Sequence, residues 1–137
     1  MKCREIEFKK VDELDGSLVY MESLKEIPFE IKRIFYIFNT PEDATRANHA
    51  NKSTDFALIC VHGYCKVSVD DGHEQMNVSL NSPNKGLYIP QLTWMKTYDF
   101  STDCVLLVLA NSPYEKNQYY ENYEEFKLIA REQKGVR

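Results

Sequence analysis

Turn residues divide this chain into short strand-like runs at intervals of about eight to twelve residues, a spacing typical of β-sandwiches and β-barrels. The strongest turn signal is Asp70-Asp71-Gly72-His73, because Asp-Gly supplies the positive φ that a tight hairpin turn needs. The flanking runs, residues 64–69 and 74–80, are therefore predicted to form a β-hairpin. Residues 104–110 are entirely apolar and predict a central strand.

Three further segments complete the expected fold. Residues 29–38 alternate with a period of two, and both faces become apolar toward the end, which predicts a strand that is buried on both sides there. Residues 39–52 are too polar for a core strand and poorly patterned for a helix, so we expect an irregular loop. Helical spacing of Tyr123, Phe126 and Ala130 predicts a C-terminal helix. The expected class is all-β, a small β-barrel with a C-terminal α-helix.

Charge and hydropathy exclude two classes of partner. The 137 residues include 17 Lys and Arg against 21 Asp and Glu, a net charge of -4, whereas a nucleic-acid binder shows a basic excess or a basic stripe. Residues 1–15 contain no apolar stretch of the kind found in a signal peptide, and the longest apolar run, 104–110, is far too short for a membrane span. We therefore expect a cytoplasmic protein with neither a nucleic-acid nor a membrane partner.

The four cysteines, Cys3, Cys60, Cys65 and Cys104, contain no Cys-x-x-Cys pair, so the spacing supports neither a zinc knuckle nor a thioredoxin-like motif. Three of them lie in apolar, strand-like runs. We expect reduced cysteines that act as small buried apolar residues.

The histidines argue against a catalytic metal. Metal-binding cupins, which are small conical β-barrels, carry His-x-His, then a Glu, then a distant His in a later strand. This chain offers His49-Ala50-Asn51, then Asp55, and Met95 after Trp94. One imidazole with an amide and a thioether is a poor ligand set for a divalent metal. We expect no metal at this position.

Several stretches, including the loop Arg46-Ala47-Asn48-His49-Ala50-Asn51-Lys52, together resemble one family, the sugar-nucleotide 3,4-ketoisomerases of the FdtA/QdtA type, which are metal-independent WxcM-like cupins. The resemblance runs in order along nearly the whole chain, over residues 15–19, 27–38, 46–52, 63–67, 70–72, 86–89, 94, 98–101 and 103–106. It implies a jelly-roll cupin fold, a single cupin domain over residues 1–137, no cofactor, and a homodimer.

The resemblance also implies a reaction. Family members convert dTDP-4-keto-6-deoxyglucose to a 3-keto sugar, on the way to deoxyamino sugars of bacterial surface glycans such as lipopolysaccharide. The family loop usually reads Arg-Gly-x-His-Ala-His, so this chain departs from it at Ala47 and Asn51. Met95 stands where some members have a further His.

Combined with the family reaction, the residues suggest catalytic roles. Isomerisation takes a proton from C3, which the C4 ketone acidifies, and delivers one to C4, work that suits an imidazole. His49 is therefore assigned as the base. Arg33, Tyr36 and Arg46 are candidates to hold the enediolate oxygens, and Asn51 offers hydrogen bonds but cannot titrate.

Further residues are expected to bind the substrate. Arg46 and Lys52, with Arg33 and Lys96, can make a local positive mouth for a diphosphate. The remaining candidates for substrate contact are Asn48, Tyr88, Trp94 and Tyr98. Tyr36, Tyr88 and Trp94 are equally compatible with an ordinary core role.

Two alternatives to the ketoisomerase stay open. One is an epimerase or isomerase that acts on a different nucleotide sugar, because the loop is altered. The other is a cupin that binds a nucleotide sugar without turnover, which the loss of titratable groups at Asn51 and Met95 favours.

Overall fold

The computed structural model describes residues 1–135, and residues 136–137, the end of the domain expected from the sequence, lie outside the described part. Two five-stranded sheets face each other, and every strand pair in them is antiparallel. In spatial order the first sheet consists of β1 (Arg4–Glu7), β9 (Lys85–Ile89), β6 (Phe56–His62), β11 (Val105–Ala110) and β4 (Arg33–Ile37). The second consists of β12 (Tyr119–Tyr120), β5 (Arg46–Asn51), β10 (Trp94–Tyr98), β7 (Cys65–Asp70) and β8 (Gln75–Leu80).

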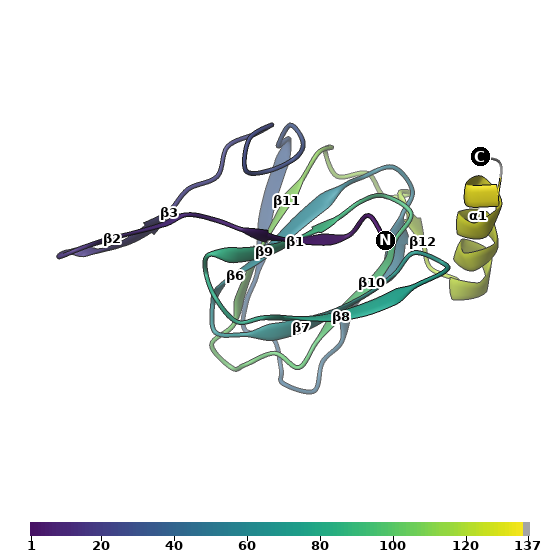
Figure 1. Cartoon of the computed structure of the whole chain (residues 1–137). Helices are drawn as coiled ribbons and strands as arrows, with labels where there is room; N and C mark the ends of the chain where they lie inside the picture. Colours follow the sequence, from purple (N-terminus) through teal and green to yellow (C-terminus); the bar gives the residue numbers. More distant parts are fainter. Residues whose placement is uncertain (136–137) are drawn as a thin grey trace.

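Two elements lie outside this barrel. The strands β2 (Lys10–Glu13) and β3 (Gly16–Val19) form a separate two-stranded hairpin, which projects far from the barrel in Figure 1. The helix α1 (Tyr123–Gly135) lies at the opposite end of the same view. The expected all-β fold with one C-terminal helix is confirmed. None of the helices in the described residues has the length and apolar character needed to cross a bilayer.

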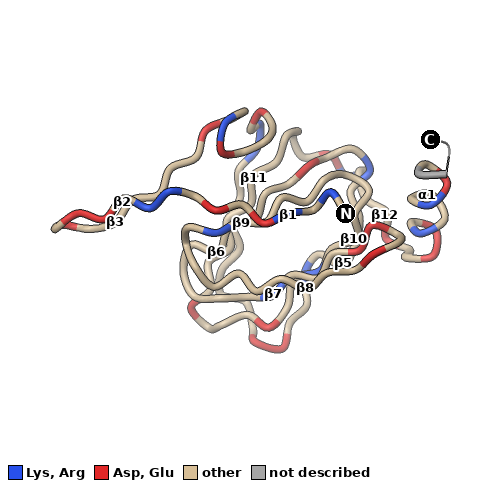
Figure 2. Tube along the Cα trace, viewed as in Figure 1, with Lys and Arg blue, Asp and Glu red and all other residues tan. Residues whose placement is uncertain are grey.

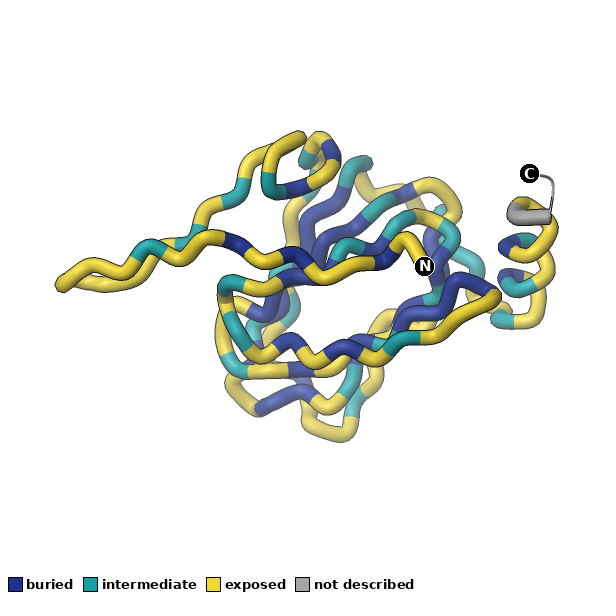
Figure 3. Tube along the Cα trace, viewed as in Figure 1, coloured by how far each residue is buried: buried dark blue, intermediate teal, exposed yellow. Residues whose placement is uncertain are grey.

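Three apolar layers hold the barrel together, and Figure 3 shows the buried positions concentrated along the paired strands. The largest cluster fills the space between the sheets, with Leu58, Val67 and Leu106 at its centre. A second covers the outer face of the first sheet with the segment that includes Ile27 and Phe29. The third consists of Ala50, Phe126 and Ala130, with Trp94, Tyr120 and Tyr123 packed against it, so α1 packs against the outer side of β5, β10 and β12.

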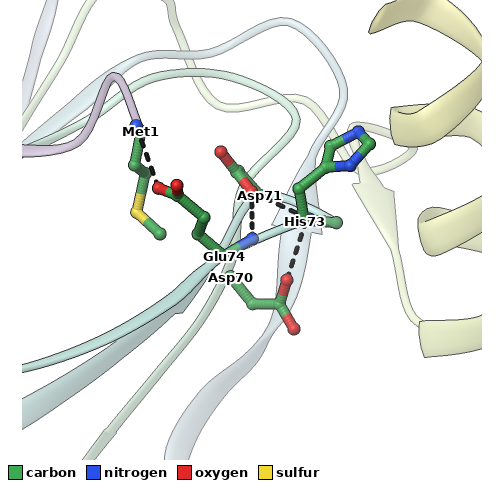
Figure 4. A network of polar contacts seen from close by, with 6 residues as sticks. Met1, Asp70, Asp71, His73 and Glu74 are labelled. Carbon is green, nitrogen blue, oxygen red and sulfur yellow. Dashed lines mark hydrogen bonds and ion pairs between the residues drawn. The ribbon is translucent and has the colours of Figure 1, made fainter. Parts of the chain in front are cut away.

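The predicted hairpin turn is confirmed and is visible in Figure 4. The Asp70 carboxylate accepts a hydrogen bond from the Gly72 amide at 2.7 Å. The Asp71 carboxylate accepts two, from the His73 amide at 2.9 Å and the Glu74 amide at 2.8 Å. Asx-type bonds of this kind satisfy the backbone donors of a tight turn. The Tyr123 hydroxyl also donates to Asp70, at 2.5 Å, which ties the turn to α1.

Two expectations about the barrel are wrong. Residues 39–52 are not all loop, because 46–51 form β5, where the cavity described below accommodates polar side chains that a filled core would exclude. Residues 29–38 are not a strand buried on both sides. Only Arg33–Ile37 form β4, and Ile34 and Tyr36 are 61% and 62% exposed. The reason is that β4 is an edge strand whose outer face nothing in residues 1–135 covers.

The charged residues of both signs are distributed over the surface, in agreement with the expectation that the chain has no basic stripe. Figure 2 shows acidic and basic residues spread along the loops, the helix and the projecting hairpin, with no run of basic residues in this view. The hairpin carries both signs, and Lys10 pairs with Asp12 at 3.8 Å.

Candidate functional site

A β-bulge in β5 shapes the site. The register against β10 pairs His49 with Met95 and Ala47 with Lys96, so Asn48 is the inserted residue. Ala47 and Asn48 have positive φ angles, 65° and 59°. The extra residue brings Arg46 and His49, three positions apart, to the same side of the strand, opposite the inward-facing Thr97 and Met95.

Between the two sheets lies a cavity of about 170 Å³. The second sheet contributes the polar side of its lining, namely Arg46, His49, Thr97 and Tyr119, together with Met95. The first sheet contributes an apolar wall of Phe35, Ile37, Phe56, Leu58, Leu106 and Val108. A mostly apolar cavity with a few convergent polar groups is the usual form of a small-molecule site.

His49 is half-buried in this lining, and its ring centroid lies 4.4 Å from that of Tyr119. Its Nδ1 atom is buried without a hydrogen-bond partner. Burial lowers the pKa of His49, and the negative charge of Glu121 opposes this only in part. His49 is therefore neutral near pH 7, with an imidazole nitrogen able to accept a proton.

Arg33 and Asn51 share this lack of partners. The Arg33 guanidinium lies over aromatic rings, 5.4 Å from the centroid of Phe35 and 5.8 Å from that of Phe56, and its buried Nε has no acceptor. Asn51 is 4% exposed, two residues after His49 on the same face of β5, and neither polar atom of its amide has a partner.

Within the described residues, every buried side-chain nitrogen or oxygen that lacks a hydrogen bond belongs to Arg33, His49 or Asn51. An unpaired buried polar group costs roughly 1–3 kcal/mol. His49 lines the cavity, Asn51 lies two residues along β5 from it, and the Arg33 guanidinium lies over Phe35 and Phe56 of the cavity wall. Unpaired buried groups in and beside one cavity are the pattern of a site whose polar groups await a ligand.

The other candidate residues lie elsewhere in the single chain. Asn48 is exposed and accepts a hydrogen bond at 3.1 Å from the indole of Trp94, whose ring packs against Tyr123 and Phe126 under α1. Tyr36 is on the exposed face of β4. Tyr88 packs on the outer face of the first sheet. The Tyr98 hydroxyl donates a hydrogen bond to Asn77 at 3.4 Å. The Lys52 ammonium lies over the Tyr120 ring. Of the candidate residues, the structure thus places Arg46 and His49 in the cavity lining and Arg33 and Asn51 beside it, and it leaves the others away from the cavity.

Sequence reasoning missed Tyr119, which contacts His49 and pairs with Asn51 in the sheet. Its strand, β12, has only two residues. A two-residue strand between a loop and a helix carries no periodicity, so no signal in the chain marks this tyrosine.

A sequence model of the family described as FdtA: WxcM-like, C-terminal, matches residues 1–131. The chain belongs to this family. Among curated proteins, this chain is 42% identical over 127 residues to a TDP-4-oxo-6-deoxy-alpha-D-glucose-3,4-oxoisomerase from Aneurinibacillus thermoaerophilus. The match covers 93% of this chain and 91% of the relative.

Two solved structures extend this likeness to the fold. A 3,4-ketoisomerase from Helicobacter canadensis superposes with a TM-score of 0.91 at 40% identity, covering 96% of this chain and 98% of that one. A histidine-to-asparagine variant of the 3,4-ketoisomerase QdtA from Thermoanaerobacterium thermosaccharolyticum, in complex with TDP-4-keto-6-deoxyglucose, gives 0.91 at 36% identity, covering 96% and 95%. The resemblance to this cupin family is thereby confirmed.

The bulge also explains one family feature. The FdtA-type loop usually has glycine where this chain has Ala47, and the φ of 65° there lies in the left-handed region that glycine adopts most readily. This chain adopts the same left-handed conformation with an alanine, whose Cβ makes it less favourable by about 1–2 kcal/mol of conformational free energy.

Proposed function

We propose that this FdtA-family chain is a sugar-nucleotide 3,4-ketoisomerase that interconverts dTDP-4-keto-6-deoxyhexose and dTDP-3-keto-6-deoxyhexose, with His49 as the base. The observation that carries the proposal is the unpartnered imidazole nitrogen of His49 in the cavity lining. Further unpartnered buried atoms belong to Asn51, two residues along β5, and to Arg33, which lies over two aromatic rings of the cavity wall. The relatives support the substrate class, because the curated relative is named as a TDP-4-oxo-6-deoxyglucose 3,4-oxoisomerase and the QdtA variant holds TDP-4-keto-6-deoxyglucose.

The chemistry follows from the protonation state of His49. Neutral His49 accepts the C3 proton, and the electron pair of the C3–H bond moves to give an enediolate. Protonation at C4 by the imidazolium, together with transfer of the O3 hydroxyl proton to O4, then gives the 3-ketone and the 4-hydroxyl and regenerates neutral His49. Arg33 has no carboxylate partner within residues 1–135, so its charge is free to stabilise an enediolate or diphosphate oxygen. Asn51 can donate from its amide nitrogen to a substrate oxygen but takes no part in proton transfer.

A second candidate is favoured by Asn51 itself. If proton delivery to C4 needs a second imidazole, a chain with Asn51 in the motif holds the ketosugar without completing the reaction. The asparagine variant of QdtA in complex with the ketosugar shows that, in that relative, such a replacement is compatible with a bound substrate. A different nucleotide sugar remains the third alternative.

Proton NMR of dTDP-4-keto-6-deoxyglucose in D₂O separates these candidates. Wild-type protein is expected to remove the C3 proton signal and to produce 3-keto-sugar resonances, while His49→Ala does neither. Exchange at C3 without a 3-keto product would leave a half-reaction, and Asn51→His should then restore the product. Broadened thymidine resonances without exchange would establish binding alone, and unaffected ligand signals would refute the proposed substrate.

We also propose a homodimer. β4 is an unpaired edge strand whose outer face exposes Ile34 and Tyr36, and exposed Phe38 follows it. The two-stranded hairpin exposes Leu14 and Leu18. An uncovered apolar edge strand is an association site, and an isolated two-stranded hairpin is marginally stable in water. A second copy of the chain would cover both.

The proposed compartment is the cytoplasm. Support comes from Cys60, Cys65 and Cys104, which are buried thiols and not disulfides, as is typical of proteins in a reducing compartment.

A further inference from the structure

Three cysteines that are scattered along the sequence meet at one end of the barrel interior. The Sγ atoms of Cys60, Cys65 and Cys104 all lie within 4.8 Å of one another, and the Cys60 and Cys104 sulfurs are 3.5 Å apart. The three side chains are 0%, 1% and 3% exposed. Cys60 comes two residues after the cavity-lining Leu58, and Cys104 comes two residues before the cavity-lining Leu106. The cluster therefore continues the inner faces of β6 and β11 past the cavity.

The spacing of the sulfurs fits a single metal ion. A metal–sulfur bond of about 2.3 Å, the length found for zinc thiolates, places three sulfurs in a plane around the ion at about 4.0 Å from one another. The Cys60–Cys104 separation of 3.5 Å is 0.5 Å shorter than this value, and the two separations to Cys65 are at most 0.8 Å longer than it. Small side-chain rotations therefore suffice to bring all three sulfurs into bonding distance.

The number of ligands selects the ion. Structural zinc is almost always tetrahedral with four protein ligands, and within residues 1–135 no His, Asp or Glu joins the three cysteines. Soft thiolate ligands favour Cu(I), which does not need a fourth ligand. We propose that Cys60, Cys65 and Cys104 form a three-sulfur site for a soft monovalent cation, Cu(I).

Cys104 also lines a surface depression of about 290 Å³, together with Tyr36, Phe38 and Asp103. Cu(I) binds to thiolates, so each Cu–S bond that forms releases a thiol proton to solvent. No electron is transferred, because the copper is supplied as Cu(I).

The test is an anaerobic competition titration of the full chain with Cu(I) held by bicinchoninate. Wild-type protein is expected to bind one Cu(I). Because even residues that only support metal ligands contribute about 10–100-fold to affinity, Cys60→Ser, Cys65→Ser and Cys104→Ser should each weaken binding by at least about 100-fold. Cys3→Ser is the matched control, since Cys3 is also buried but lies outside the cluster, and it should leave the affinity unchanged.

A second measurement does not depend on variants that fold. X-ray absorption at the copper edge of the wild-type complex should give three sulfur neighbours. The site is refuted if Cu(I) is not retained, if Cys3→Ser weakens binding as much as the others, or if nitrogen or oxygen dominates the coordination shell. Tighter retention of Zn²⁺ than of Cu(I) under matched competition would overturn the choice of ion, and a Cys60–Cys104 disulfide in freshly purified protein would overturn the three-sulfur site itself.

Discussion

Asn51 offers a quantitative test of whether the cavity is built for a ligand at the expense of stability. Its amide is 4% exposed and neither of its polar atoms has a partner. Burying an unpaired amide costs roughly 1–3 kcal/mol. Leucine has a similar volume and no polar atoms, so Asn51→Leu should remove this cost and raise the free energy of unfolding of the ligand-free protein by about 2 kcal/mol.

The assay is urea denaturation, with thermal unfolding as a check, in the absence of nucleotide sugar. For a chain of this size a change of 1 kcal/mol shifts Tm by roughly 4 °C, so Asn51→Leu should melt about 8 °C higher than wild type. The same variant should bind the ketosugar more weakly, because the amide no longer meets the substrate.

Asn111→Leu is the matched control. The Asn111 amide is fully engaged with Asp55, accepting from the backbone amide at 2.9 Å and donating to the carboxylate at 3.2 Å. Losing these bonds should destabilise the protein by about 1–2 kcal/mol. If Asn51→Leu is also destabilised, then its amide is already satisfied in the free protein, and the interpretation of these atoms as waiting for a ligand is refuted.

Three other perturbations test other parts of the structure. The pKa of His49 in the folded state lies below the 6.5 of the unfolded chain, so the unfolded state takes up the proton first as the pH falls. The free energy of unfolding should therefore fall as the pH drops below about 6.5. In urea titrations at several pH values, His49→Gln should flatten that slope. Gly63→Ala places a Cβ 2.9 Å from the Cys104 Cα at a φ of 73°, and should lower stability by about 2 kcal/mol in the same assay, a result contradicted by an unchanged midpoint. Ile34→Lys should convert the dimer to monomer in analytical ultracentrifugation, whereas Leu128→Lys, an equally exposed position on α1, should not, and a wild-type monomer would disprove the proposed interface.

Local signals predicted most of the barrel. The Asp-Gly turn and the apolar run before residue 110 each specify their structure within a few residues, so β7, β8 and β11 were predictable. The strand β5 was not, because its polar side chains are tolerated only where a cavity replaces packed core. The burial of β4 was not either, since periodicity identifies a strand but does not show whether another element covers it.

The candidate site was predictable where its residues lie close together in the sequence, and not where distant segments form it. His49, Asn51 and Arg46 belong to one short segment that the family resemblance identified, and the structure keeps all three in β5, with Arg46 and His49 lining the cavity. Tyr88 and Trp94 lie on the outer faces of their sheets, and the face a strand residue occupies depends on the partner strand rather than on its own neighbours. Tyr119 comes into contact with His49 only through a distant pairing of chain segments.

The bulge at Asn48 also sets a rule for how this loop can change during evolution. Because the bulge offsets the alternation of the strand by one residue, straightening it at constant length would turn Arg46 to the opposite side of the sheet. Losing the bulge together with one residue would keep both side chains on the same face, since residues two positions apart in a regular strand share a face. Descendants that retain the cavity should therefore vary freely in length before residue 46, in the exposed connection from β4, but change the length of the segment from 46 to 49 only together with the bulge.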